Sequence, residues 1–187
     1  MAKGKQFRFF GEVPDIDAGS ILQPDYRQVV ATALQRIIER THILDGGETR
    51  VEEVMSFARR IGVDHLGIAT CAGLIREARL AQEIFESQGF RVDSVCCKVG
   101  SIPKEEIGLE DAEKIRPRQF EALCNPIAQA RLLERAGAQL NVVVGLCVGH
   151  DSLFFMHSKA PATVLIAKDR VLGHNPAACL YTSHSYY

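Results

Sequence analysis

Most of the six cysteines in this chain stand where a predicted strand ends or a predicted helix begins. They are Cys71 in IATCAG, Cys96 and Cys97 in VCCKVG, Cys124 in LCNPIAQARLL and Cys147 in GLCVGHD. In an open parallel α/β sheet, the carboxyl ends of the strands and the N-termini of the following helices face one crevice, where such folds bind ligands. We therefore expect thiols that are distant in sequence to meet in space, as in a metal or cluster site.

Taken alone, each cysteine is more often a small buried hydrophobe than a ligand, so the argument depends on their convergence. Cys96 and Cys97 are adjacent in a strand and point to opposite faces, so one belongs in the core, and we assign Cys97, nearer the strand end, to the site. Cys71 and Cys124 stand at helix N-termini, where backbone N–H groups favour the thiolate that binds metal. Cys179 lies outside this pattern and is expected to be incidental.

Polar residues near these cysteines are candidates for catalytic or supporting roles. His150 follows Cys147 by three residues, and Asp151 can cap the next helix while its neighbour turns toward the crevice. His174 closes the last predicted hairpin, and Lys98, next to the double cysteine, is either a solvated strand-end lysine or a group that holds an anionic ligand. The remaining histidines are expected at helix ends, on the surface or in the polar tail: His42, His65, His157 and His184.

The elements that position these residues follow the plan of one α/β domain spanning residues 1–187. Gly and Pro interrupt residues 1–23, which we expect to form an arm or loop. Residues 24–61 show two amphipathic helical patterns separated by Asp45-Gly46-Gly47, and this helical pair is expected to pack against the sheet. Residues 62–181 form the α/β core.

Within the core, strands are predicted to end at Thr70, Cys97, Leu146 and Ala167, and helices to cover 74–88, 126–136 and a short stretch from Asp151. The first crossover helix implies parallel strands. We predict a three-layer, mostly parallel sheet in Rossmann-like or flavodoxin-like order, with the strand before Cys71 beside the strand before Cys147 at the topological switch point. Residues 100–123 are too polar for the interior and form a surface excursion. RVLGH after Lys168-Asp169 is predicted to close a C-terminal antiparallel hairpin.

Composition excludes several classes of function. A net charge of -1 with dispersed Lys and Arg gives no electrostatic footprint for nucleic acid. The apolar runs are about half the roughly 20 residues that a membrane helix needs, and no signal peptide opens the chain. We therefore expect a cytoplasmic protein, in which thiols stay reduced and read as ligands or reactive groups rather than disulfides. Neither Gly-rich phosphate fingerprint follows the first strand, so no nucleotide cofactor is predicted.

The runs CCKVG, LCNPIAQA, GLCVGHDSLF and KDRVLGHNPAA, in this order, resemble the family of domain of unknown function eighteen-forty-seven (DUF1847), whose members are described as metal-binding proteins without an established reaction. The likeness runs from Gly62 to Tyr181, with weaker agreement over the two preceding helices. The resemblance implies a metal site with these ligands and nearby residues: Cys71, Cys97 or Cys96, Cys124 and Cys147, with His150, Asp151, Lys159 and His174 close by. Our candidate cofactor-binding residues are Asn125, Cys96 and Lys159. Family members often carry a further cysteine-rich N-terminal segment, whereas residues 1–19 here contain no cysteine.

The ligand type narrows the choice of metal. Thiolates select zinc or an iron–sulfur cluster, and structural zinc usually comes with close pairs such as C-x₂-C, which this sequence lacks. Isolated cysteines from separate strand ends suit a cluster within a crevice, where helix N-termini offset its negative charge. We predict a [4Fe–4S]-type cluster held by three or four cysteines, with one iron open to a small molecule if only three bind, and zinc as the alternative.

Two other functions remain open at this point. A metal-free enzyme could use an activated thiol, either Cys124 at its helix start or Cys147 with His150 nearby, as in thiol hydrolases or sulfur-transfer proteins. A zinc-thiolate sensor or storage module would need no turnover. A second copy of the chain is a candidate partner, because the predicted hairpin and the Tyr186-Tyr187 tail offer an edge that another subunit can cover.

Overall fold

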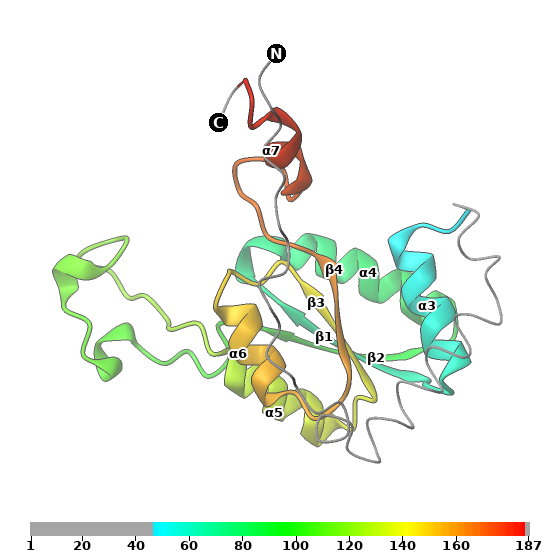
Figure 1. Ribbon diagram of the computed structural model, residues 1–187. Coiled ribbons are helices and arrows are strands. Elements are labelled where there is room, and N and C mark those ends of the chain that lie inside the picture. Colours follow the sequence, from blue (N-terminus) through cyan, green and yellow to red (C-terminus); the bar gives the residue numbers. More distant parts are fainter. Residues whose placement is uncertain (1–46, 186–187) are drawn as a thin grey trace, which may run out of the picture. The chain divides into compact units, whose positions relative to one another are not determined.

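The computed structural model describes residues 47–185 (Figure 1). The chain divides into two compact units, Met1–Gly47 and Glu48–Tyr187, and the site lies in the second. The expected arm and the first predicted helix lie outside the described residues. No helix in the described part of the chain is long and apolar enough to cross a membrane.

Four parallel strands form the sheet in the order β2-β1-β3-β4. Their bounds are β1 His65–Thr70, β2 Arg91–Cys96, β3 Leu140–Val144 and β4 Ala162–Ile166. β1 and β3 are buried along their whole lengths, as expected of apolar runs in the middle of a parallel sheet. Because β1 pairs with β2 on one side and β3 on the other, the chain reverses its direction of travel at β1. The prediction of an α/β fold with this switch point is confirmed.

Helices cover both faces of the sheet (Figure 1). On one face lie α3 (Arg50–Arg60) and α4 (Ile75–Ser87), which connects β1 to β2. On the other lie α5 (Pro126–Ala136), which crosses from β2 to β3, and α6 (His150–His157), which leads to β4. A short helix, α7 (Ala177–Thr182), follows the last strand. The three layers place the start of α5 at the carboxyl edge of the sheet, where β1 and β2 end.

Local sequence signals explain where these helices begin and end. Thr49 and Glu52 form a capping box at the start of α3, whose residues Val54, Met55 and Ala58 are buried, so the second of the two predicted N-terminal helices is confirmed. The Asn125 side-chain oxygen accepts a hydrogen bond from the backbone N–H of Ala128 (2.9 Å). Pro126 occupies the first position of that helix, α5, and Gly137 ends it at φ 82.

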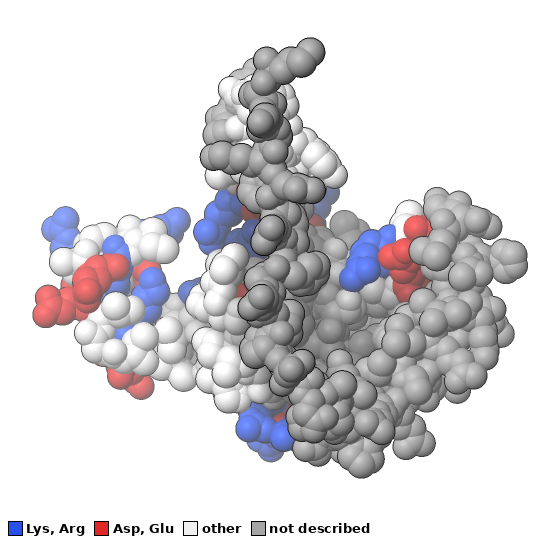
Figure 2. Space-filling view, in the orientation of Figure 1, with Lys and Arg blue, Asp and Glu red and all other residues white. Residues whose placement is uncertain are grey.

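Residues 98–123 form the expected surface excursion between β2 and α5. It contains two short 3₁₀ turns, η3 (Lys104–Ile107) and η4 (Asp111–Glu113). The side chain of Lys114 is buried in ion pairs with Glu105 and Asp111, rather than in an apolar core. Figure 2 shows acidic and basic side chains interspersed over this excursion. Its base is closed where Leu123 N–H donates to the Ile102 carbonyl (2.7 Å), so the residues before and after the excursion are held together.

The predicted C-terminal hairpin is wrong, because residues 170–174 form turns rather than a strand. The carboxylate of Asp169 accepts hydrogen bonds from the backbone N–H groups of Val171 and Leu172, both at 2.9 Å. The Asp169 carbonyl also accepts from the N–H of His174 (2.7 Å). These local bonds satisfy backbone groups that an antiparallel strand would have used. Among the described residues, the sheet is therefore entirely parallel.

Gly67 is expected to be sensitive to substitution because β1 and β3 meet closely there. A Cβ atom at Gly67 would lie 2.2 Å from Asn141 Oδ1 and 2.9 Å from Ala138 Cβ. We expect Gly67→Ala to lower the free energy of unfolding by roughly 1–3 kcal/mol, the usual cost of overpacking. Urea unfolding followed by circular dichroism measures this change.

The matched control is Gly47→Ala, since a Cβ there meets no atom of residues 48–185 within 4 Å. Its unfolding free energy should stay within about 0.5 kcal/mol of the parent protein. Equal stability of the two variants would contradict the close approach of Gly67 to Asn141.

Candidate metal centre

Cys71 and Cys97 lie side by side, one residue beyond the ends of β1 and β2. Thr70 and Cys96 form the last paired row of the two strands. The ladder continues by one bond, since the N–H of Cys97 donates to the Thr70 carbonyl (2.8 Å). The Cys97 sulfur accepts a hydrogen bond from the N–H of Ala72 (3.3 Å), the residue that follows Cys71.

Cys124 reaches the same place from the start of α5. The N–H of Asn125 donates to the Cys97 carbonyl (2.7 Å), which fixes the chain before α5 against the end of β2. The negative charges of Cys71 and Cys124 as thiolates both raise the pKa of Cys97, which makes the three residues neighbours. Cys97 therefore stands between Cys71 and Cys124, and the three thiols form one cluster at the carboxyl edge of the sheet.

Ionisation of Cys97 is strongly disfavoured. Burial raises the pKa of its thiol to about 12, and the negative charge of Cys124 and Cys71 as thiolates acts in the same direction. The hydrogen bond from the Ala72 N–H favours the thiolate but is outweighed. The cluster thus carries a protonated thiol at its centre at neutral pH.

The pKa of Cys71 is lowered by a neighbouring cation. Burial alone would raise its pKa, but the hydrogen bond from the Lys168 ammonium (2.5 Å) and that from the Gly73 N–H outweigh it, so the pKa of Cys71 lies below its ordinary value. Lys168 belongs to the segment that follows β4. The fourth strand therefore contributes a positive charge to thiols that come from the first two strands and α5.

Cys147 follows β3 and stands apart from this cluster. Its sulfur accepts a hydrogen bond from the Arg170 guanidinium (Nη2 to Sγ 3.8 Å). Its side chain is half-buried, and within the described part of the chain the structure gives it no hydrogen bond to the other thiols. Of the four predicted ligands, the structure brings together Cys71, Cys97 and Cys124, and leaves Cys147 paired with Arg170.

Two of the predicted supporting residues serve local backbone structure. His150 begins α6, and the Asp151 carboxylate accepts from the N–H groups of Gly149 (3.0 Å) and Ser152 (2.7 Å). Asp151 thus caps α6 from within its first turn rather than from before it. The Nδ1 atom of His174 accepts a hydrogen bond from the Asp169 N–H (3.1 Å). Nδ1 of His174 therefore accepts a local backbone hydrogen bond in the turn that follows β4.

The other candidates are distributed around the sheet. Lys98 donates from its ammonium to the Ala122 carbonyl at the base of the surface excursion. Cys96 packs against the core, opposite in direction to Cys97, and Asn125 caps α5. Lys159 is exposed just before β4 begins, so it lies at the opposite edge of the sheet from the thiols. The structure does not bring Lys159 to the cluster.

Sequence reasoning missed Lys168, Arg170 and Gln129. The two cations follow the last predicted strand, and the same edge rule that united the cysteines would have placed them at the crevice. Gln129 occupies a buried position of α5 and donates from Nε2 to the carbonyls of Thr70 (3.0 Å) and Val95 (2.7 Å). A glutamine on the apolar side of an amphipathic helix was the available signal.

His65 is a further correction. It was expected at a helix end or on the surface, but it is buried at the start of β1, and its Nε2 lies 2.7 Å from Asp93 Oδ2. A hollow of about 300 Å³ adjoins it at the amino ends of the strands. This hollow is at the opposite edge of the sheet from the thiol cluster.

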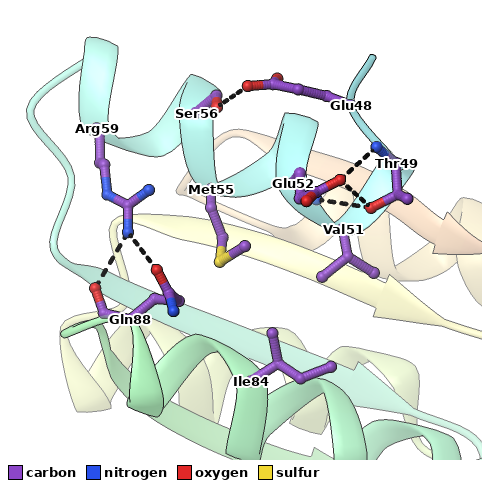
Figure 3. A pocket seen from close by; sticks show the side chains of 9 residues that line it. All are labelled: Glu48, Thr49, Val51, Glu52, Met55, Ser56, Arg59, Ile84 and Gln88. Carbon is purple, nitrogen blue, oxygen red and sulfur yellow. Dashed lines mark hydrogen bonds between the residues drawn. The ribbon is translucent and has the colours of Figure 1, made fainter. Parts of the chain in front are cut away.

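A groove of about 550 Å³ lies between α3 and α4 (Figure 3). Its polar lining is already paired: Glu52 with Thr49, Ser56 with Glu48, and Arg59 with Gln88. Among the described residues that line it, none carries a thiol or an imidazole. The groove therefore offers no chemistry comparable to that of the cysteines.

The side chains are not arranged around a single ion. Across residues 47–185, no group of three or more His, Cys, Asp or Glu is placed to hold one metal ion. The Lys168 ammonium contacts Cys71, and any metal must draw the thiols inward.

Cys71 is expected to react with iodoacetamide faster than the other thiols at pH 7, because Lys168 lowers its pKa and raises its thiolate fraction. The rate plotted against pH should have a midpoint below the ordinary thiol value of about 8.5. Lys168→Met should move that midpoint upward and slow labelling at pH 7 by roughly tenfold for each unit of pKa. Peptide mass spectrometry measures the rate at each cysteine.

Arg170→Met is the control for general loss of positive charge, since Arg170 contacts Cys147 rather than Cys71. It should leave the Cys71 midpoint in place. A midpoint that Lys168→Met does not move would show that the ammonium does not stabilise the thiolate.

The sequence of this chain is similar to that of a known protein family. The model for "Protein of unknown function (DUF1847)" matches residues 21–165. An uncharacterized protein of Methanocaldococcus jannaschii is 46% identical over 147 residues, which cover 79% of this chain and 73% of the relative. No solved structure matches the chain. The family model covers more than half of this chain, and the archaeal relative aligns with most of it. The chain therefore belongs to the DUF1847 family of proteins of unknown function.

Proposed function

We propose that this protein binds a metal centre through Cys71, Cys97 and Cys124, and that the centre is an iron–sulfur cluster. The observation that carries the proposal is the position of Cys97: its N–H donates to the Thr70 carbonyl, its carbonyl accepts from the Asn125 N–H, and its sulfur accepts from the Ala72 N–H. These bonds hold Cys97 between the residues next to Cys71 and Cys124. Three sulfurs gathered at a topological switch point are a donor set suited to a soft, thiophilic metal.

The electrostatics of Cys97 fit a cation at this place. Its pKa is raised to about 12 by burial and by the thiolate charges of Cys124 and Cys71. A metal cation reverses this effect, since it attracts the thiolates that otherwise repel one another, and metal binding releases their protons. Ionisation of the three thiols is thus unfavourable without a metal and favourable around a bound metal cation.

The surrounding charges fit an anionic metal–thiolate group. Several thiolates around iron and sulfide carry net negative charge, which needs nearby donors. Lys168 touches Cys71, Arg170 touches Cys147, and the Ala72 N–H points at the Cys97 sulfur. The chain supplies positive groups from two elements that are distant in sequence.

An iron–sulfur cluster accounts for the arrangement of the cysteines better than a single zinc ion does. Its iron atoms are spread over a larger volume, so its thiolate ligands lie farther apart than those of one ion. Within residues 47–185 the side chains do not form a set that could hold a single ion, and the cysteines come from separate elements rather than one C-x₂-C knuckle. Both features favour a cluster over zinc.

The fourth position has two candidate occupants. Cys147 is at the same edge of the sheet and can complete a four-thiolate set by leaving Arg170. If Cys147 stays with Arg170, the three remaining thiols leave one iron open to a small molecule. When bound, such a cluster supplies electron transfer or, at an open iron, a Lewis-acid position.

The expected result of anaerobic purification is a brown protein with matched iron and acid-labile sulfide and little zinc. Cys71→Ser, Cys97→Ser and Cys124→Ser should each lower iron and sulfide sharply, because each removes a ligand. Cys179→Ser is the matched control and should retain both, since Cys179 lies in α7 away from the strand ends. Absorption spectra together with metal and sulfide analysis per chain make the measurement.

Other outcomes would redirect the proposal. Zinc without sulfide would replace the cluster by a mononuclear thiolate site. Absence of iron and sulfide from oxygen-free protein, with folding intact by circular dichroism, would overturn the iron–sulfur proposal.

A metal-free nucleophilic function has one specific observation in its favour. The Lys168 ammonium holds Cys71 with a lowered pKa, which is how enzymes activate a cysteine. The thiol in this position is Cys71, whereas sequence reasoning had considered Cys124 and Cys147. The alkylation profile described above tests this function, and a fast Cys71 in protein that contains no metal would support it.

A further inference from the structure

We propose that Cys71 and Cys97 form a redox-active dithiol, which a hydroperoxide oxidises to a disulfide. This inference goes beyond the metal site, since it requires the protein chain and an oxidant but no metal. It assigns a modification site to the same edge of the sheet, and bound metal would protect the two sulfurs from it.

The strand register places the two cysteines as partners. The residues of β1 and β2 pair in an unbroken parallel register from His65↔Arg91 to Thr70↔Cys96. Cys71 and Cys97 are the next residues of the two strands in this register. Parallel neighbours are about 4.8 Å apart, which is within the roughly 4.4–6.8 Å between Cα atoms that disulfides span. The bond from Cys97 N–H to the Thr70 carbonyl (2.8 Å) keeps that spacing past the strand ends.

The side chains themselves are neighbours. The Cys97 sulfur accepts a hydrogen bond from the N–H of Ala72 (3.3 Å), the residue that follows Cys71, so the Cys97 side chain lies against the end of β1. Both residues stand where the chain leaves strand geometry, Cys71 just before the 3₁₀ turn η2 (Ala72–Leu74) and Cys97 at the start of a turn. The backbone can therefore adjust locally without breaking the paired rows of the sheet.

The surroundings assign different roles to the two thiols. Cys71 keeps 7% of its surface accessible beside the exposed residues Ala72 and Gly73, and its sulfur accepts from the Lys168 ammonium (2.5 Å). Because these neighbours are exposed, Cys71 is the sulfur of the pair that a small peroxide can reach. Cys97 is only 1% exposed and is the thiol that resolves the oxidised Cys71.

The chemistry balances with one hydroperoxide. The Cys71 thiolate attacks the peroxide oxygen, an S–O bond forms and the O–O bond breaks, and the leaving alkoxide or hydroxide takes a proton from solvent. The Cys97 sulfur then attacks the Cys71 sulfur, an S–S bond forms and the S–O bond breaks. The departing hydroxide leaves as water with the Cys97 proton. Two thiols lose two electrons and the peroxide gains them.

Cys124 competes for the same partner, because it precedes Asn125, which is bonded to Cys97. The β1–β2 ladder distinguishes the two pairs. Cys71 and Cys97 are tied by strand register, and Cys71 carries the Lys168 contact. Cys124 is tied to Cys97 only through the bond from the Asn125 N–H to the Cys97 carbonyl. The proposal therefore commits to the Cys71–Cys97 bond.

The experiment treats the full chain, as purified and after chelation, with one equivalent of hydrogen peroxide, and then blocks free thiols. Two of the six thiols should be lost, and peptide mapping should find Cys71 joined to Cys97. Cys97→Ser should stop at a sulfenic acid on Cys71, trapped by dimedone, whereas Cys71→Ser should abolish both products. Lys168→Met should slow disulfide formation by about tenfold, as for loss of one charge-assisted hydrogen bond.

Cys179→Ser is the control and should form the disulfide at the parent rate, and circular dichroism should first show that every variant is folded. A disulfide between Cys97 and Cys124, or no loss of thiols in chelated protein, would overturn the proposal. Iron and sulfide contents are measured on separate untreated protein. A failed oxidation and an absent cluster are thus distinct results.

Discussion

The candidate centre depends on the pairing of β1 with β2 on one side and β3 on the other. This pairing brings two strand ends and the start of α5 to one edge, and the ladder extends one residue further at Cys71 and Cys97. The N–H of Cys71 donates to the Val144 carbonyl (3.3 Å), and the N–H of Cys97 donates to the Thr70 carbonyl (2.8 Å). These two backbone hydrogen bonds hold Cys71 against the end of β3 and Cys97 against the end of β1.

Buried contacts hold this edge in place behind the thiols. The amide of Gln129 ties α5 to the ends of β1 and β2, since it donates to Thr70 and Val95 while its own Oε1 has no protein partner among the described residues. Gly145, at φ 67, ends β3 where a Cβ would lie 2.5 Å from Leu74. Leu74 can therefore pack over the end of β3 and fix the turn after Cys71. The positions of the sulfurs follow from the packing of three elements rather than from one loop.

Electrostatics gives the cluster its asymmetry. A buried thiol between two others resists ionisation, whereas its neighbour gains a lysine partner and ionises more easily. The same imbalance suits two kinds of chemistry: attraction of a metal cation that relieves the repulsion among thiolates, and division of labour between an attacking and a resolving sulfur. The two uses exclude one another at any moment, because a sulfur bound to metal is not free to form a disulfide.

The sequence by itself determined the fold class and the strands and helices of the core, because continuous apolar runs and helix caps are local signals. The geometry of parallel sheets also predicted that cysteines distant in sequence stand at one edge of the sheet. The sequence pattern failed at residues 170–174, where side-chain bonds from Asp169 replaced the predicted hairpin strand. Only the tertiary structure decided that Lys168 meets Cys71, that Arg170 meets Cys147 and that Lys159 lies at the far edge. These outcomes depend on how the segments around β4 pack against strands that come from distant parts of the chain, and no local pattern encodes such contacts.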